Sequence, residues 1–216
     1  MVESLRQELK SALSGNFGNF QLTYDWMSEL VPAQILMLKC QVLWCQGTEF
    51  ALSDAKKDAM MLWKERHMSG ISAQCSAIRE CTIPLQRSKL SSILTIEVHH
   101  RNVLQRLETK KVDDCADFEW QICLRSYVMS DFLQCRFNQV NSTLIYSFEY
   151  WGVTSRLVVT ALTEKCYITL TSALHLMLGG APFGPAGTGK TETTKDLAKT
   201  VGRQCIVFNC GVLLFE

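Results

Sequence analysis

The segment Gly184-Pro185-Ala186-Gly187-Thr188-Gly189-Lys190-Thr191 matches the phosphate-binding pattern G-x-x-x-x-G-K-[ST]. In this pattern a glycine-rich turn leads directly into the N-terminus of a helix. The backbone N–H groups and the helix dipole at such a terminus both favour a bound anion. The segment therefore predicts a P-loop fold with a site for a nucleoside triphosphate.

The residue types in the loop suit separate parts of that task. Gly187 and Gly189 let the backbone curl around phosphates without a Cβ clash. Lys190 can reach the β- and γ-phosphate oxygens, and the Thr191 hydroxyl is placed to join a Mg²⁺ shell. We therefore expect ATP and Mg²⁺ as cofactors, with Thr191 as the metal ligand. The expected phosphate-binding set is Gly184, Pro185, Ala186, Gly187, Thr188, Gly189, Lys190, Thr191 and Glu192.

The residues after the loop read as a helix from Glu192 to Val201. Leu197 and Val201 are four residues apart and would share its apolar face. Glu192/Lys195 and Asp196/Lys199 are spaced as charge pairs on a helix. Gly202 stands where a helix commonly ends.

Two short segments are candidate strands around this helix. Cys205-Ile206-Val207-Phe208 is apolar and predicts a buried strand, with Cys205 and Cys210 packed in the core. Gly180-Ala181-Pro182-Phe183 would be the strand that leads into the loop, although glycine and proline are poor strand residues. Loop, helix and strand then follow in the order of a βαβ unit.

Hydrolysis needs more than the loop supplies. Only the stretch from Glu192 to Glu216 follows the loop, whereas a nucleotide-hydrolysing domain needs on the order of 100 residues. No Asp or Glu lies on an apolar strand after the loop, and Glu216 is terminal. We therefore name no catalytic residue and expect weak nucleotide binding, without meaningful hydrolysis, from this chain alone.

The composition excludes several classes of function. The 22 basic and 21 acidic residues give a net charge of +1, so no basic surface predicts nucleic-acid binding. The N-terminus lacks the apolar core of a signal peptide, and no stretch is long and apolar enough for a membrane span. None of the ten cysteines forms a C-x-x-C pair. The sequence predicts reduced, mostly buried thiols in a cytosolic protein.

The N-terminal part is mainly helical by its pattern. Leu5, Leu9 and Leu13 recur at helical spacing, and residues 32–52 form a strong apolar pattern that begins at a proline. Residues 54–67 predict a second helix that ends at Ser69-Gly70. The expected fold is mixed α and α/β, with a mainly helical segment (1–140) followed by an incomplete P-loop α/β module (141–216).

Several longer stretches resemble the dynein heavy chain, and specifically its axonemal branch. The resemblance covers most of the chain and is most specific after residue 145. Its strongest stretches are Phe148-Glu149-Tyr150-Trp151-Gly152, residues 156–171, 184–198 and 204–210. Upstream, residues 32–44, 93–99 and 118–120 resemble the C-terminal part of the linker, the lever that lies across the motor ring.

The resemblance implies roles for both parts of the chain. Residues 1–140 would belong to the linker, and 141–216 to the N-terminal part of the first AAA+ module. Leu157, Val158 and Leu162 would line the adenine pocket. In this family ATP hydrolysis swings the linker and moves a microtubule motor of the cilium or flagellum, which also carries intermediate and light chains. No nucleic acid or membrane is implied.

The sequence departs from the family pattern at two places. Ala161 stands where the family usually has proline, at the edge of the adenine pocket. Val212-Leu213-Leu214-Phe215-Glu216 replaces an acidic, glycine-containing turn. The first is a small change, whereas the second suggests an alternative or truncated end.

Two other hypotheses remain at this point. A small P-loop kinase or GTPase usually places its loop near the N-terminus, with an acidic Mg²⁺ residue downstream, and this chain has neither. A non-enzymatic interaction fragment would rely on the helical segment alone. It would expose apolar side chains around residues 206–208 and 212–215.

Overall fold

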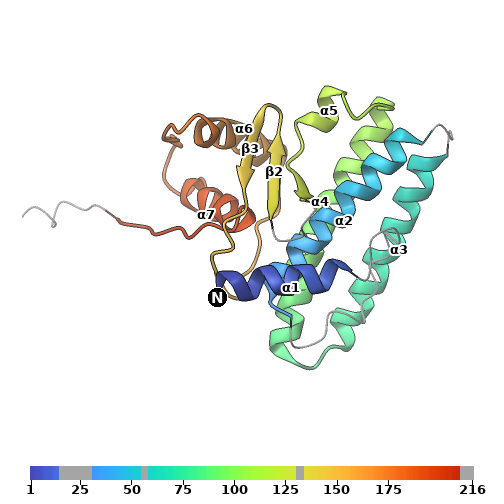
Figure 1. Cartoon of the computed structure of the whole chain (residues 1–216), viewed down its shortest axis with the longest axis horizontal. Coiled ribbons are helices and arrows are strands. Elements are labelled where there is room, and N and C mark those ends of the chain that lie inside the picture. Colours follow the sequence, from blue (N-terminus) through green and yellow to red (C-terminus); the bar gives the residue numbers. More distant parts are fainter. Residues whose placement is uncertain (15–30, 55–57, 130–133, 210–216) are drawn as a thin grey trace, which may run out of the picture.

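The computed structural model describes residues 1–14, 31–54, 58–129 and 134–209. Figure 1 shows long helices on one side, and a small sheet with two further helices on the other. The helices are α1 (Val2–Ser14), α2 (Ala33–Ser53), α3 (Ala59–Glu80), α4 (Pro84–Lys110), α5 (Phe118–Gln121), α6 (Ala161–His175) and α7 (Lys190–Thr200). The strands are β1 (Arg125–Val128), β2 (Cys135–Gln139) and β3 (Ser142–Ile145).

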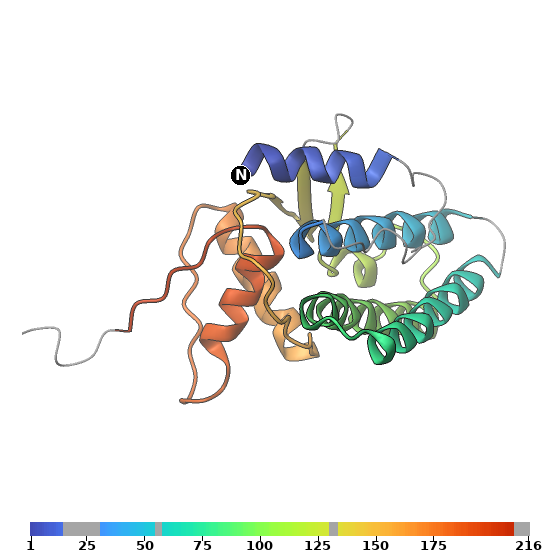
Figure 2. The same ribbon diagram turned by 90° about the horizontal axis from the view of Figure 1, so that it is seen from below.

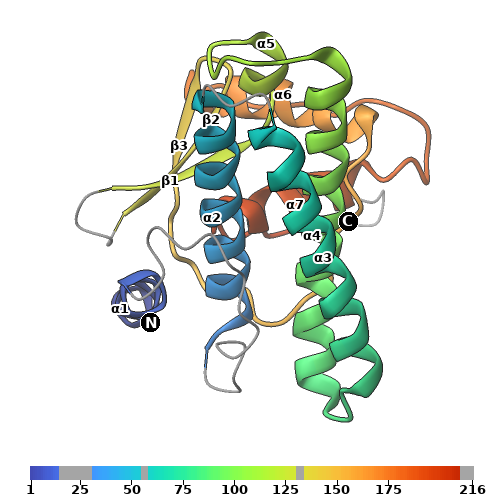
Figure 3. The ribbon, with the colours of Figure 1, turned by 90° about the vertical axis from the view of Figure 1, so that its right-hand side faces the viewer.

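Helices α2, α3 and α4 run alongside one another and form the helical part of the molecule (Figure 3). Nearly every residue of α2 is buried, which places it at the centre, since a helix that is apolar on all sides must be covered on all sides. Pro84 starts α4 at a position where its missing N–H costs no helical hydrogen bond. In the described ranges no helix combines the length and the apolar character needed to cross a membrane.

The predicted end of the second helix at Ser69-Gly70 is wrong, because α3 continues through both residues to Glu80. One glycine inside a helix costs only about 1 kcal/mol, and contacts with α4 on both sides of it offset that cost. Gln74 donates from Nε2 to the Leu90 carbonyl at 3.0 Å, and His67 contacts the Glu97 carbonyl at 3.0 Å. The predicted start at residue 54 is also wrong, since α3 begins at Ala59.

The three strands form one antiparallel sheet in the order β1-β2-β3. Phe137 of β2 lies opposite Ser126 of β1 and Leu144 of β3. A two-residue turn at Val140 and Asn141 joins β2 to β3, so strands on both sides of residue 140 pair with each other. The division of the chain at that residue stays a prediction.

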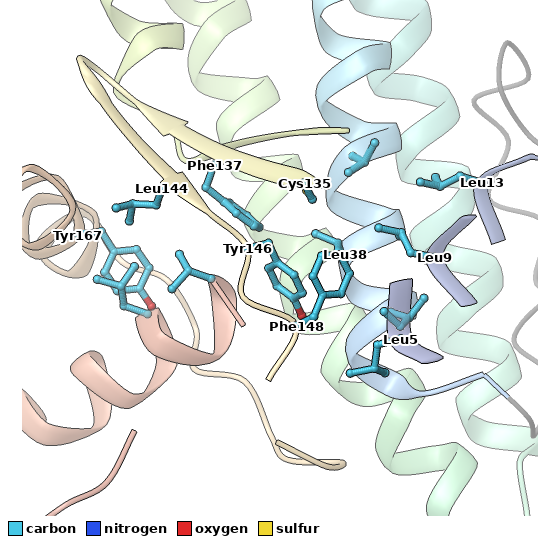
Figure 4. Close-up of a cluster of buried hydrophobic side chains, with 14 residues drawn as sticks. Leu5, Leu9, Leu13, Leu38, Cys135, Phe137, Leu144, Tyr146, Phe148 and Tyr167 are labelled. Atoms are coloured by element: carbon cyan, nitrogen blue, oxygen red, sulfur yellow. The ribbon is translucent and has the colours of Figure 1, made fainter. Parts of the chain in front are cut away.

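One hydrophobic core joins the helical part to the sheet and to α6 and α7 (Figure 4). Leu9 of α1 and Leu38 of α2 pack into the same cluster as Phe137 of the sheet. Leu197 of α7 and Val201, the residue that caps its C-terminus, complete the cluster, and both are buried as predicted from their spacing. The helix that follows the phosphate loop is therefore anchored in the common core.

The two predicted strands beside the loop are wrong: residues 180–183 and 205–208 form neither strand nor helix. A strand forms by hydrogen bonding to a neighbour, and neither segment pairs with β1, β2 or β3. Cys205 is exposed instead of packed in the core, while Cys210 and residues 212–216 lie outside the described residues. The side chains of Ile206 and Phe208 are exposed, as expected for an incomplete sheet.

A buried polar cluster lies where α2, α3 and α4 meet. The Glu97 carboxylate lies 3.3 Å from Nδ1 of His67 and 3.5 Å from Nδ1 of His100, and all three side chains are at most 5% exposed. The His100 ring stacks on Trp44, with ring centroids 4.0 Å apart. Burial lowers the pKa of His100 to about 3 and that of neighbouring His99 to about 4, and raises the pKa of Glu97 to about 7.

These shifts predict a loss of stability in mild acid. His99 and His100 are held neutral, so their stabilising contribution is complete above pH 6.5 and falls as the pH drops. Each of the two histidines then lowers the free energy of unfolding by up to about 1.4 kcal/mol per pH unit. Glu97 acts in the opposite sense. Its contribution to the stability of the folded protein is complete below pH 4.5 and is lost as the pH rises through 7. The effect of two histidines exceeds that of one carboxyl group, so we expect the free energy of unfolding to fall as the pH is lowered from 6.5 to 4.5.

Urea unfolding of the wild type and His100→Phe across pH 4.5–7.5 would check this prediction. Phenylalanine can still stack on Trp44 but does not bind a proton. The free energy of unfolding of His100→Phe should therefore fall less steeply in mild acid. His175→Gln, a change at an exposed histidine, is the control and should keep the wild-type slope. Equal slopes for His100→Phe and the wild type would contradict the prediction.

Candidate nucleotide-binding site

The phosphate loop connects an extended segment to the N-terminus of α7. Gly187 and Gly189 have φ angles of +77° and +79°, in the left-handed region. A Cβ atom at either position would meet no other atom within 4 Å. Glycine is therefore required by the backbone conformation and not by lack of space.

The ammonium group of Lys190 lies inside the curl of the loop. Its Nζ donates to the Gly184 carbonyl at 2.8 Å and to the Pro185 carbonyl, and it lies 3.4 Å from the Thr188 hydroxyl. Thr188 itself donates to the Pro185 carbonyl at 2.9 Å. These contacts hold a positive charge among the residues predicted to surround the phosphates.

The N-terminus of α7 is open to an incoming acceptor. Gly189 is its N-cap residue, and no side chain caps the helix. The hydroxyls of Thr193 and Thr194 instead bond back to the carbonyls of Gly189 and Lys190, at 2.9 and 3.1 Å. The first N–H groups of a helix have no partner within it, so they can bind an anion here. The side chain of Thr191 is exposed at this end.

A carboxylate in the middle of α7 fixes the position of this helix. Asp196 is paired with Arg156 through two contacts of 2.9 and 3.0 Å, and it also accepts from the Tyr167 hydroxyl at 2.7 Å. The side chains of Arg156 and Asp196 are 5% and 2% exposed. The predicted Asp196/Lys199 pair is therefore wrong, although the Glu192/Lys195 pair is present at 2.7 Å.

The charge on Asp196 is maintained by its partners. Burial alone would raise its pKa, but the Arg156 guanidinium, together with hydrogen bonds from Tyr167 and the Leu157 N–H, outweighs burial and lowers the pKa. Asp196 thus stays ionised and connects three segments: α7, α6 and the stretch before α6. Sequence spacing could not reveal this network, because Arg156 and Asp196 are forty residues apart.

The residues predicted to contact adenine lie on the stretch before α6 and on its first turn. The N–H of Leu157 donates to Asp196 at 3.1 Å, which ties the backbone at this position to α7. Leu157, Val158 and Leu162 are 38%, 66% and 70% exposed. The structure thus ties the Leu157 backbone to the phosphate-loop helix, while the side chains of all three residues are exposed.

The stretch from Tyr146 to Thr160 is held from both sides. Gln34 of α2 donates to the Tyr146 hydroxyl at 2.9 Å and to the Glu149 carbonyl at 3.0 Å. On the other side, Glu149 donates from its N–H to the Gly202 carbonyl at 2.9 Å. At its end, Thr160 caps α6 in a reciprocal capping box. The helical part of the chain thus contacts the backbone that carries the candidate site.

Comparison with known proteins identifies relatives of this chain. A family model described as "Hydrolytic ATP binding site of dynein motor region" matches residues 146–214. The chain is 38% identical over 214 residues, 98% of its length, to human "Dynein axonemal heavy chain 6". The chain belongs to the dynein heavy chain family.

Other dyneins match at similar levels. The identity is 42% over 185 residues, 83% of the chain, with "Dynein gamma chain, flagellar outer arm" of Chlamydomonas reinhardtii. It is 44% over 180 residues, again 83% of the chain, with mouse "Dynein axonemal heavy chain 1". The chain spans only 4% to 5% of the length of these dynein heavy chains.

Proposed function

We propose that this chain is the ATP-binding portion of an axonemal dynein motor. The observation that carries the proposal is the phosphate loop, with the Lys190 ammonium inside its curl and the uncapped N-terminus of α7 beside it. Backbone N–H groups there would hold the β- and γ-phosphates, and Lys190 would exchange its carbonyl contacts for phosphate oxygens. Residues 184–192 form the proposed phosphate site.

The remaining parts of the nucleotide have candidate contacts in the same region. The Thr191 hydroxyl is exposed at the start of α7, where it fits a Mg²⁺ shell completed by phosphate oxygens and water. When bound, Mg²⁺ would neutralise phosphate charge. Leu157, Val158 and Leu162 would contact the adenine ring, and their exposed apolar surface supports this role.

The described residues after the loop favour binding over hydrolysis. They include two acidic side chains, Glu192 and Asp196. Glu192 is exposed and paired with Lys195, while both Asp196 oxygens are occupied by Arg156, Leu157 and Tyr167. The Asp196 carboxylate therefore has no free oxygen to position an attacking water.

The relatives suggest where such a nucleotide site would act. Within a whole motor, ATP hydrolysis would move residues 1–140 as part of the linker, and the motor would act on microtubules of the ciliary or flagellar axoneme. Intermediate and light chains would be its partners. The contacts of Gln34 with the stretch before α6 support such a connection between the two parts.

Titration of the purified chain with a fluorescent ATP analogue and Mg²⁺ tests the proposal. We expect saturable binding that Lys190→Ala weakens by about 10- to 100-fold, since a hydrogen bond from a charged group contributes about 1.5–3 kcal/mol. Lys199→Ala removes the same charge from the far end of α7 and should bind as the wild type does. A folded wild type without saturable binding, or equal binding by Lys190→Ala, would refute the proposal.

A further inference from the structure

An ion pair connects helix α4 to the first turn of α6. Arg106 donates from Nη1 to Oε2 of Glu164 at 2.7 Å, and its Nη2 lies 3.4 Å from Oε1. His99, also on α4, lies 3.9 Å from the same carboxylate. The Arg106 and Glu164 side chains are only 26% and 18% exposed. Partial burial shields this two-point contact from solvent, which makes it stronger than an open surface pair.

The surrounding space shows why this contact matters. A cavity of about 40 Å³ is lined by residues of α2, α4, α6 and the stretch before α6, including His99, Leu157 and Glu164. A cavity of this volume has room for water. Figure 2 shows one end of α6 beside α4. The Arg106–Glu164 ion pair therefore links α4 to α6 beside this small cavity.

Glu164 is rigidly placed on α6. Its N–H donates to the Thr160 carbonyl at 2.9 Å, within the capped first turn of the helix. Leu162, one of the proposed adenine contacts, belongs to the same turn. An ion pair that fixes the Glu164 carboxylate therefore also fixes the backbone of the turn that carries Leu162.

We propose that Arg106 is a positioning residue for the base side of the nucleotide site, acting through Glu164. This inference rests on the proposed function and assigns to helix α4 a specific influence on nucleotide affinity. The hydrogen bonds and ion pairs of Arg106 reach Glu164, Glu119 and Cys123, and none of them reaches the phosphate loop or a residue proposed to contact the nucleotide. Its effect should therefore appear with ligands that carry a base and not with phosphate groups alone.

Binding of ATP and of inorganic triphosphate, each with Mg²⁺, separates the two sides of the site. Arg106→Gln should weaken ATP binding by about 3- to 10-fold, the range of modest coupling between sites, and leave triphosphate binding unchanged. Glu164→Gln should have the same effect, and the double variant should be no worse than either single one. Arg106→Lys, which keeps the charge, should recover part of the affinity.

Glu108→Gln is the matched control, because Glu108 lies on α4 like Arg106 but pairs with Lys64 of α3. It should bind both ligands as the wild type does. Wild-type ATP affinity in both Arg106→Gln and Glu164→Gln, or an equal loss for ATP and triphosphate, would overturn the inference alone. A wild type that binds neither ligand, or binding indifferent to Lys190→Ala, would refute the proposed function and this inference with it.

Discussion

Asp196→Ala is expected to lower the free energy of unfolding by about 3–5 kcal/mol, the usual cost of leaving one partner of a buried ion pair without the other. The Arg156 guanidinium would remain buried without its carboxylate, and the Tyr167 hydroxyl and the Leu157 N–H would lose their acceptor. Because Asp196 connects α7 to α6 and to the stretch before it, nucleotide affinity should fall as well. Urea unfolding monitored by circular dichroism gives the stability.

Two comparisons make the Asp196 result specific. Glu192→Ala removes an exposed carboxylate from the same helix and should change stability by less than about 0.5 kcal/mol. Replacing both partners, as Arg156→Met with Asp196→Leu, should recover part of the loss, since no buried charge is left alone. A cost for Asp196→Ala no larger than that for Glu192→Ala would show that the buried pair does not hold α7.

Gly202→Ala should destabilise the protein by about 2–5 kcal/mol, the sum of backbone strain and overpacking. Gly202 has a φ of +64°, which is unfavourable for any residue with a Cβ atom. That Cβ would lie 2.6–2.8 Å from the Tyr146 ring, and Gln34 holds the ring through its hydroxyl. The substitution therefore disturbs the contact between the end of α7 and the common core.

Thermal and urea unfolding would measure this effect, with Gly179→Ala as the control. A Cβ at Gly179 would meet no atom within 4 Å, so that substitution should be nearly neutral. Tyr146→Leu combined with Gly202→Ala would relieve the clash but keep the backbone strain. A neutral Gly202→Ala would contradict both the left-handed conformation and the close approach of the ring.

Local patterns in the sequence predicted the elements that depend on neighbouring residues. The apolar spacing of Leu197 and Val201 identified the buried face of α7, and Gly202 marked its end. The pattern of residues 32–52 likewise predicted α2. The same kind of reasoning failed at Ser69-Gly70, where packing against α4 outweighs the local cost of glycine.

By itself, the sequence determined the phosphate loop, the helix after it and the family, because these depend on residues adjacent in the chain. Only the tertiary structure decided that Asp196 pairs with Arg156, that Arg106 reaches Glu164, and that residues 205–208 remain unpaired. Ion pairs and strand pairing join segments that lie far apart in the chain. Their geometry is set by packing in the common core, which no local pattern of residues encodes.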